Sequence, residues 1–164
     1  MKKIILAIMI LPLMFSCNSK SNDEANIKLI EGYVSAVENL DYKTMENLLS
    51  EDYLGLGPSF GDSIRKDQAV ENWKFYSQNL YKKIHYNKSR NASVTIPDGE
   101  NKGEWVSNWA ELEIEYQDGN KITLWSNTNY QIKEGKIIKS YTFYNEADGL
   151  RQMGYVFIDP QDLN

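Results

Sequence analysis

Two side chains of the sequence, Asp52 and His85, could together carry acid–base chemistry. His85 is the only histidine, and Cys17 is the only cysteine, so the sequence offers no serine or cysteine triad. A carboxylate buried beside Tyr53 could exchange protons with an imidazole. The two residues are therefore the candidate catalytic pair if the protein is an enzyme. The alternatives stay open: Asp52 as a solvated acid at a turn, and His85 as a surface residue of a strand.

A row of carboxylates and the overall charge bear on metals and partners. Glu111, Glu113 and Glu115 recur at every second position, which places them on one face of a strand. No histidine or further cluster of acids lies nearby in the sequence, so we predict solvated strand residues and no metal site or cofactor. The net charge is −5 and no basic stripe is present, which excludes nucleic acid as the main partner.

The N-terminus has the pattern of an export signal. Lys2 and Lys3 precede an apolar run, Ile4 to Phe15, that is too short to span a bilayer as a free helix. The run ends at Ser16-Cys17, and this layout resembles a bacterial lipoprotein signal. That resemblance implies cleavage before Cys17 and lipid on its thiol and amine. An ordinary secretory peptide with a leftover cysteine is the alternative.

The sequence is expected to divide into three segments. These are a signal peptide over 1–16, a polar lipidated tether over 17–25, and one folded domain over 26–164. Lipid on Cys17 would anchor the exported domain to a bacterial membrane, at the periplasmic face or the cell surface. Because a second cysteine is lacking, no disulfide can form within the chain, and the domain depends on burial of its apolar residues.

Hydrophobic periodicity predicts helices first and then a sheet. The expected helices begin near Asn22 or Asp23, at Asp41 and near Asp67. A short strand at 53–56 is expected between the second and third helices, and long strands at 83–96, 105–116, 121–132 and 136–145 are expected after the third. Asp118-Gly119 and Glu134-Gly135 are each expected to form a two-residue hairpin turn.

If both turns pair the strands through these dipeptides, the parity of residue numbers assigns the two faces of the sheet. One face, expected to be concave and to pack under the helices, collects Trp105, Trp109, Ile122, Leu124, Thr128, Tyr130, Ile132, Ile137, Tyr141, Phe143 and Asn145. The other face, with Leu112, Trp125 and Tyr144 at its centre, would suit a homodimer that packs sheet on sheet.

The C-terminal layout is similar to that of a known superfamily. Gly135-Lys136-Ile137 leads into an aromatic strand, Tyr141 to Asn145, and then a short tail, Leu150 to Gly154. This layout resembles the nuclear transport factor 2-like superfamily, in its SnoaL-like branch. The resemblance implies an α+β fold, a cone-shaped barrel with three N-terminal helices packed on a curved antiparallel sheet. The open end of such a cone is a ligand pocket, which we expect to be lined by Tyr53, Trp73, Trp109, Tyr141 and Asn145.

Three functions are compatible with this pattern. The leading hypothesis is a lipid-anchored domain that binds a small apolar or aromatic molecule. A cofactor-free isomerase, dehydratase or cyclase is the alternative, and a protein-interaction module is a third. Asn145 stands where relatives carry an aspartate, and an amide cannot act as a general base. Asn145 is therefore expected either to bond a ligand or to cap the end of the strand.

Overall fold

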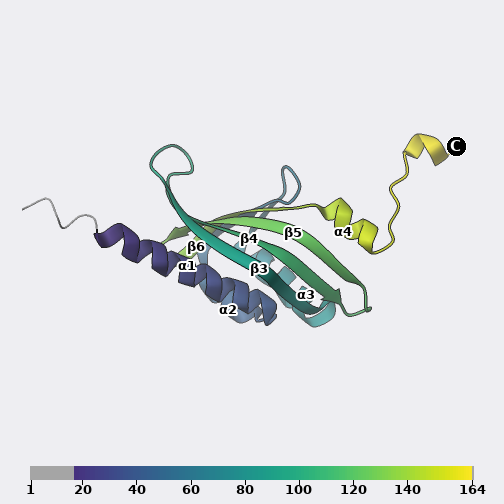
Figure 1. Cartoon of the computed structure of the whole chain (residues 1–164), viewed down its shortest axis with the longest axis horizontal. Helices are drawn as coiled ribbons and strands as arrows, with labels where there is room; N and C mark the ends of the chain where they lie inside the picture. Colours follow the sequence, from purple (N-terminus) through teal and green to yellow (C-terminus); the bar gives the residue numbers. More distant parts are fainter. Residues whose placement is uncertain (1–16, 164) are drawn as a thin grey trace, which may run out of the picture.

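A computed structural model of the chain describes residues 17–163, which form a six-stranded sheet packed against helices (Figure 1). The helices are α1 (Cys17–Glu38), α2 (Tyr42–Leu48), α3 (Lys66–Asn79) and α4 (Glu146–Gln152), followed by a 3-10 helix, η1 (Pro160–Leu163). The strands are β1 (Leu49–Leu56), β2 (Ser63–Arg65), β3 (Tyr81–Ile96), β4 (Gly103–Tyr116), β5 (Lys121–Lys133) and β6 (Lys136–Tyr144). The predicted signal peptide over 1–16 lies outside the described residues.

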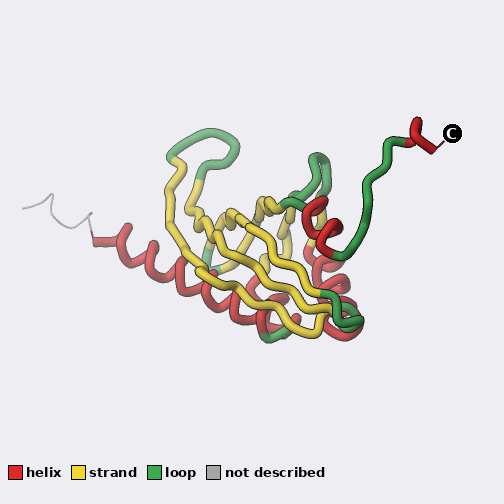
Figure 2. The backbone as a smooth tube through the Cα atoms, turned by 45° about the vertical axis from the view of Figure 1, so that its right-hand side comes forward, coloured by secondary structure: helices red, strands yellow, loops and turns green. Residues whose placement is uncertain are grey.

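The sheet is open and curved, with the strands in the order β2-β1-β6-β5-β4-β3. All neighbouring strands pair antiparallel except β1 and β6, which are parallel. Helices α1, α2 and α3 lie on one side of the sheet, and α4 packs against β5 (Figure 1, Figure 2). The predicted fold class is confirmed: a cone-shaped α+β fold in which three N-terminal helices pack on a curved sheet.

Helix α1 is longer than its hydrophobic pattern predicts. It begins at Cys17 rather than near Asn22, so the polar segment expected as a tether is helical. This segment is held by polar contacts, because the Ser93 Oγ of β3 donates a hydrogen bond to Asp23 Oδ1 over 2.6 Å. Apolar periodicity cannot mark a helical turn that docks through hydrogen bonds. The buried side of α1 is as predicted, with Ile30, Val34 and Val37.

The next two helices begin close to the predicted positions, and α2 has the predicted cap. Asp41 precedes α2, and its Oδ1 accepts a hydrogen bond from the Thr44 backbone N–H over 3.1 Å. Helix α3 begins at Lys66, beside the predicted Asp67. Within residues 17–163, no helix is both long enough and apolar enough to cross a bilayer.

The two β-hairpin turns differ. Glu134 and Gly135 both have positive φ, 52° and 71°, and Lys133 pairs with Lys136, so the predicted two-residue turn is confirmed. The other turn contains three residues, 117–119, because the Tyr116 backbone N–H donates to the Asn120 carbonyl over 2.9 Å. Gly119, with φ of 90°, makes the extra residue possible.

The three-residue turn shifts the pairing of β4 with β5 by one residue, and this reverses the predicted faces of β4. Val106 pairs with Tyr130 and Leu112 with Leu124, so the even-numbered side chains of β4 face the helices. Trp105 and Trp109 therefore lie on the convex face, not on the concave face as predicted.

A bulge reverses the outer part of β6 in the same way. Ile132 pairs with Ile137 but Gln131 pairs with Lys139, so Ile138 is an extra residue. Beyond this bulge the concave residues are Ser140, Thr142 and Tyr144, and the convex residues are Tyr141 and Phe143. The predicted concave positions that are correct are Ile122, Leu124, Thr128, Tyr130, Ile132 and Ile137.

The observed register of β4 and β6 also places the residues of the predicted dimer face on opposite sides of the sheet. Leu112 and Tyr144 lie on the concave side, while Trp125 lies on the convex side with 70% of its surface exposed. Trp109 and Phe143 share the convex face, each pairing with Asn127, and are 44% and 54% exposed. We call Trp109, Trp125, Tyr141 and Phe143 the convex aromatic patch.

Candidate functional site

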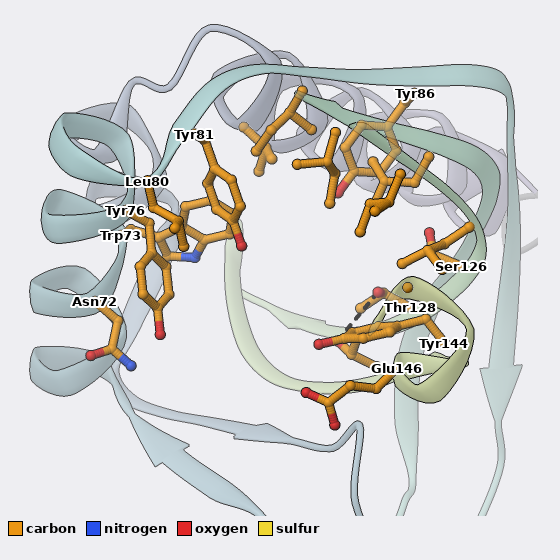
Figure 3. A pocket seen from close by; sticks show the side chains of 18 of the residues that line it. Asn72, Trp73, Tyr76, Leu80, Tyr81, Tyr86, Ser126, Thr128, Tyr144 and Glu146 are labelled. Carbon is orange, nitrogen blue, oxygen red and sulfur yellow. Dashed lines mark hydrogen bonds between the residues drawn. The ribbon is translucent and has the colours of Figure 1, made fainter. Parts of the chain in front are cut away.

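A cavity of about 490 Å³ opens between the concave face of the sheet and helices α1, α3 and α4 (Figure 3). Aliphatic side chains line part of it, including Val37, Ile84, Leu112 and Leu124. The rest is mainly aromatic or hydroxyl-bearing. A cavity of this size and composition is typical of a small-molecule site.

Tyrosines dominate the lining of the cavity. The sequence has 11 tyrosines, and eight of them reach the cavity from α1, α3 and strands β1, β3, β4, β5 and β6. These eight are Tyr33, Tyr53, Tyr76, Tyr81, Tyr86, Tyr116, Tyr130 and Tyr144. Each brings a flat apolar ring with one polar tip, which suits an aromatic ligand that needs a few hydrogen bonds.

Burial raises the pKa of several of these phenols. Burial, followed by the nearby Glu38 carboxylate, raises the pKa of Tyr86 to about 12. Burial also raises the pKa of Tyr33 and of Tyr130 well above the usual value, and neighbouring tyrosines add to both shifts. Near neutral pH these groups are uncharged hydrogen-bonding groups and not proton acceptors of useful strength.

One wall of the cavity is a cluster of packed rings. Tyr81 lies at its centre, with ring centroids 5.7 Å from Tyr76, 6.2 Å from Trp73 and 5.6 Å from Tyr116. The rings meet at angles between 48° and 62°, the edge-on or tilted contacts that aromatic pairs favour. Because each ring supports its neighbours, the wall is fixed without a ligand.

The sheet side of the cavity carries hydroxyl groups. Ser126, Thr128 and Thr142 line it, and Thr128 Oγ1 donates to Thr142 Oγ1 over 3.3 Å. Deeper in the fold, the Tyr53 hydroxyl and Ser140 Oγ are 2.7 Å apart and hydrogen-bonded. Tyr53 and Ser140 are both buried, whereas Thr142 Oγ1 accepts in its pair and can still donate its own O–H to a ligand.

The opening is polar and contains a carboxylate. Asn72 and Tyr76 from α3 face Tyr144 and Glu146 across the cavity (Figure 3). Burial raises the pKa of Tyr144, and the negative charge of Glu146 is the second cause. Among the described residues that line the cavity, Glu146 is the only one that is charged at neutral pH.

The predicted ligand residues divide between the cavity and the rest of the surface. Tyr53 and Trp73 line the cavity, whereas Trp109, Tyr141 and Asn145 do not. Tyr141 stacks on Trp105 on the convex face, with centroids 6.0 Å apart. Asn145 caps α4, because its Oδ1 accepts a hydrogen bond from the Asp148 backbone N–H over 3.1 Å. The capping alternative for Asn145 is thus the one seen in the structure.

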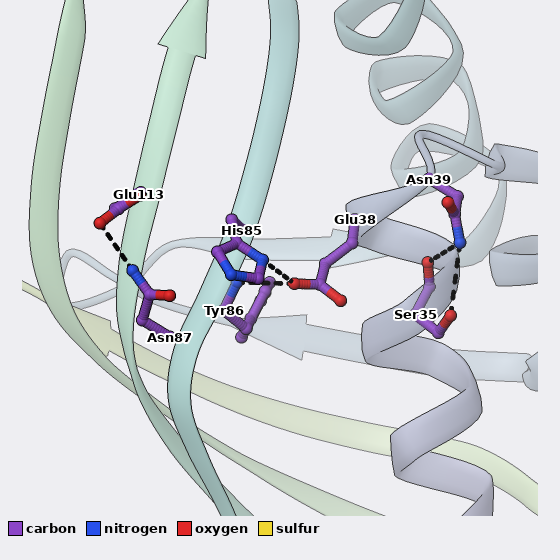
Figure 4. A network of polar contacts seen from close by, with 7 residues as sticks. All are labelled: Ser35, Glu38, Asn39, His85, Tyr86, Asn87 and Glu113. Carbon is purple, nitrogen blue, oxygen red and sulfur yellow. Dashed lines mark hydrogen bonds and ion pairs between the residues drawn. The ribbon is translucent and has the colours of Figure 1, made fainter.

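The candidate catalytic pair is not brought together. His85 Nδ1 lies 2.7 Å from Glu38 Oε1, and the same oxygen accepts a hydrogen bond from the Tyr86 backbone N–H over 2.8 Å (Figure 4). Asp52 is exposed on β1 and lies at a separate surface hollow with Arg65. Neither Asp52 nor His85 lines the cavity. In this structure they form no acid–base dyad.

The carboxylate row of β4 is occupied by surface contacts. Lys88 Nζ is 2.9 Å from Glu111, Asn87 Nδ2 is 2.6 Å from Glu113, and Lys82 Nζ is 2.6 Å from Glu115. Within residues 17–163, no group of three or more histidine, cysteine or acidic side chains is close enough to hold a metal ion.

Sequence reasoning missed most of the lining residues. Tyr76, Tyr86, Tyr144 and Glu146 were not among the candidates, although the high tyrosine count was visible in the sequence. The count does not show which rings face the cavity. That depends on the register of β4 and β6, because these strands carry aromatic residues on both faces.

The chain is similar to known proteins in structure but not in sequence. The sequence matches no family model and no curated protein. A proposed polyketide cyclase from Xanthomonas campestris is 13% identical and has a TM-score of 0.66, over 80% of this chain and 98% of that one. A proposed SnoaL-like polyketide cyclase from Shewanella denitrificans is 10% identical, with a TM-score of 0.63 over 79% and 96%.

A third solved structure is a protein with a ketosteroid isomerase-like fold from Catenulispora acidiphila, in complex with trimethylamine. It is 11% identical, with a TM-score of 0.60 over 78% of this chain and 93% of that one. At such low identities, the likeness extends to the fold and not to the activity. The chain therefore adopts the nuclear transport factor 2-like fold, as the order of its elements predicts.

Proposed function

We propose that this domain binds a small, flat, apolar molecule in the tyrosine-lined cavity and does so without transforming it. The observation that carries the proposal is the lining itself: a cavity of about 490 Å³ with rings on its walls and hydroxyls on its sheet side. The ligand would pack against the wall formed by the Trp73, Tyr76 and Tyr81 rings, and Thr128 or Thr142 would orient it by hydrogen bonds.

The alternative, a cofactor-free isomerase, dehydratase or cyclase, draws its support from the fold shared with proposed cyclases. Acid–base catalysis needs a group with a pKa matched to the working pH. In the described lining, Glu146 at the opening is the only carboxylate and there is no histidine, lysine or cysteine. An enzyme would therefore have to use Glu146, and the two functions differ in what this residue does.

The test uses residues 17–164, the expected product of signal cleavage, with Cys17→Ser to prevent acylation. N-phenyl-1-naphthylamine, a neutral dye whose fluorescence rises in apolar surroundings, should bind saturably with one site per chain. Ser126→Trp should abolish dye binding by filling the cavity from the β5 side. Thr123→Trp on the same strand is the matched control, because Thr123 is exposed and lies outside the cavity.

Circular dichroism and a thermal melt show whether each variant is folded. Folded Ser126→Trp protein that binds the dye as well as the wild type would contradict the proposal, as would a wild type that does not bind. Turnover of a bound compound that is lost in Glu146→Gln would instead support the enzyme.

The location of the domain is proposed from the sequence alone. We propose that Cys17 carries lipid and holds the domain at a bacterial membrane, facing the periplasm or the cell surface. Wild-type cells fed a radioactive fatty acid should incorporate label into the protein, and Cys17→Ser should remove both the label and the membrane association. A wild type without label would contradict this proposal.

A homodimer is also proposed, now through the convex aromatic patch. Trp109, Trp125 and Phe143 expose 44%, 70% and 54% of their surfaces on neighbouring strands. A second copy would bury this patch together with its own copy of it. Trp125→Lys should convert dimers into monomers in sedimentation, whereas Phe60→Lys, in an exposed loop, should not. A monomeric wild type at micromolar concentration would contradict the proposal.

A further inference from the structure

The charge distribution around the cavity is one-sided. Of the described residues that line it, none is a lysine, arginine or histidine, and Glu146 carries the single formal charge. Asp62 is the other acid that acts on the opening, since it contributes with Glu146 to the raised pKa of Tyr144. The formal charge of the described residues that line the opening is therefore negative.

The Glu146 carboxylate is also not engaged elsewhere. Among the described residues, no side chain forms a hydrogen bond or ion pair with it. Asp148, two residues further along α4, differs because its Oδ2 accepts a hydrogen bond from Gln152 Nε2 over 3.0 Å. Both acids suit the N-terminal turn of α4, but only Glu146 also lines the cavity.

The aromatic wall has the same electrostatic preference. Faces of tryptophan and tyrosine rings carry partial negative charge and attract ammonium groups. Tyr76 lies across the opening from Glu146, and Trp73 packs behind it (Figure 3). An ammonium group between them would meet a carboxylate on one side and rings on the other.

A carboxylate ligand would meet the opposite situation. It would lose its hydration on entering the cavity, and the described lining contains no cation that would compensate for that loss. The phenols remain neutral and could donate single hydrogen bonds, which do not offset the desolvation of a full charge.

We propose that the cavity selects its ligand by charge: it takes an apolar or aromatic amine, with the ammonium group beside Glu146, and rejects a carboxylate of the same shape. This inference rests on the proposed binding function and names its ligand class. The apolar body of the amine lies among the tyrosines, and the charged head stays at the polar opening.

The experiment is a competition between three compounds with one apolar body. 2-Naphthylmethylamine, 2-naphthylmethanol and 2-naphthylacetate are each used to displace N-phenyl-1-naphthylamine from residues 17–164 carrying Cys17→Ser. The amine should compete about tenfold better than the alcohol, and the carboxylate at least about tenfold worse. Added salt should reduce the preference for the amine, because the ion pair lies near the surface.

Two variants test whether Glu146 causes the preference for the amine. Glu146→Gln should bring the affinity of the amine down to that of the alcohol. Asp148→Asn, which removes a carboxylate from the same helical turn, should keep the full preference. If the preference survives in Glu146→Gln, the assignment to Glu146 is overturned.

The remaining outcomes separate this inference from the binding proposal. Dye and alcohol that bind, with an amine no better than the alcohol or a carboxylate that competes equally well, overturn the charge selection alone. A wild type that binds neither the dye nor any of the three compounds overturns the binding function itself.

Discussion

Aromatic side chains lie on both faces of the curved sheet, but the two faces place them in different surroundings. On the concave face, Tyr130 is buried and its pKa is raised by burial, while Tyr144 lines the cavity. On the convex face, Trp125 is 70% exposed and Trp109 is 44% exposed. Residues next to each other in the sequence thus belong either to the cavity or to an outer surface.

The difference teaches that aromatic content alone does not locate a pocket. Tyrosine predominates where the face is enclosed, because its ring packs while its hydroxyl still finds a partner, as Tyr53 does with Ser140. Tryptophan and phenylalanine predominate on the open face, where Trp109, Trp125 and Phe143 remain exposed. The chemistry of the two faces is therefore distinct even though both carry aromatic rings.

The largest effect expected from this comparison is on stability. Leu112→Lys places a charge against the core on the concave side and should lower the free energy of unfolding by about 3 kcal/mol. Trp125→Lys, on the convex side of the neighbouring strand, should change the stability of the single chain by less than about 0.5 kcal/mol. Urea unfolding at low protein concentration measures both. Equal losses in the free energy of unfolding would contradict the difference in burial between Leu112 and Trp125.

Alkaline pH should act through the concave tyrosines. Burial raises the pKa of Tyr86 in the folded chain to about 12, above its value of about 10 when unfolded, so its contribution is complete below pH 10 and is lost as pH rises towards 12. The free energy of unfolding should be level from pH 7 to 9 and then fall, by about 2–3 kcal/mol for Tyr86 alone. Tyr86→Phe should make the fall shallower. An unchanged pH profile for this variant would contradict the assignment.

A matched pair of tryptophan variants tests the ligand site. Trp73→Ala removes part of the aromatic wall and should weaken binding of N-phenyl-1-naphthylamine about tenfold, or about 1.4 kcal/mol. Trp109→Ala removes a ring of the convex face and should leave the affinity unchanged. Fluorescence titration of both folded variants gives the answer. If Trp109→Ala has the larger effect, the ligand binds on the convex face instead.

The smallest effect is expected at the end of β6. Asn145→Ala removes the cap of α4 and should cost about 1 kcal/mol of stability, with little change in affinity for the same dye. Asn47→Ala, an exposed residue within α2, is a control that should cost less. Thermal melting measures the cost. A large loss of dye binding in folded Asn145→Ala would restore this residue as a ligand contact.

Part of the candidate site could be predicted from the sequence. Tyr53 and Trp73 line the cavity as predicted, because their positions depend on β1 and α3, whose boundaries the local pattern marks well. Trp109 and Tyr141 were misplaced, because each lies beyond a register shift that local patterns do not reveal. The pairing of Asp52 with His85 failed because the sequence could not show that Glu38, distant along the chain, would contact the imidazole.

The sequence by itself determined the order of the helices and of the longer strands, the buried side of α1, the Asp41 cap and the Glu134-Gly135 turn. Each of these depends on residues within a few positions of one another, where periodicity and backbone preference act directly. Only the tertiary structure decided which face of β4 and of outer β6 became concave. One extra residue at Gly119 and another at Ile138 reversed those faces, because side chains alternate along a strand. The tyrosine cavity exists through that choice, since its rings come from segments that meet only when the sheet has curved around them.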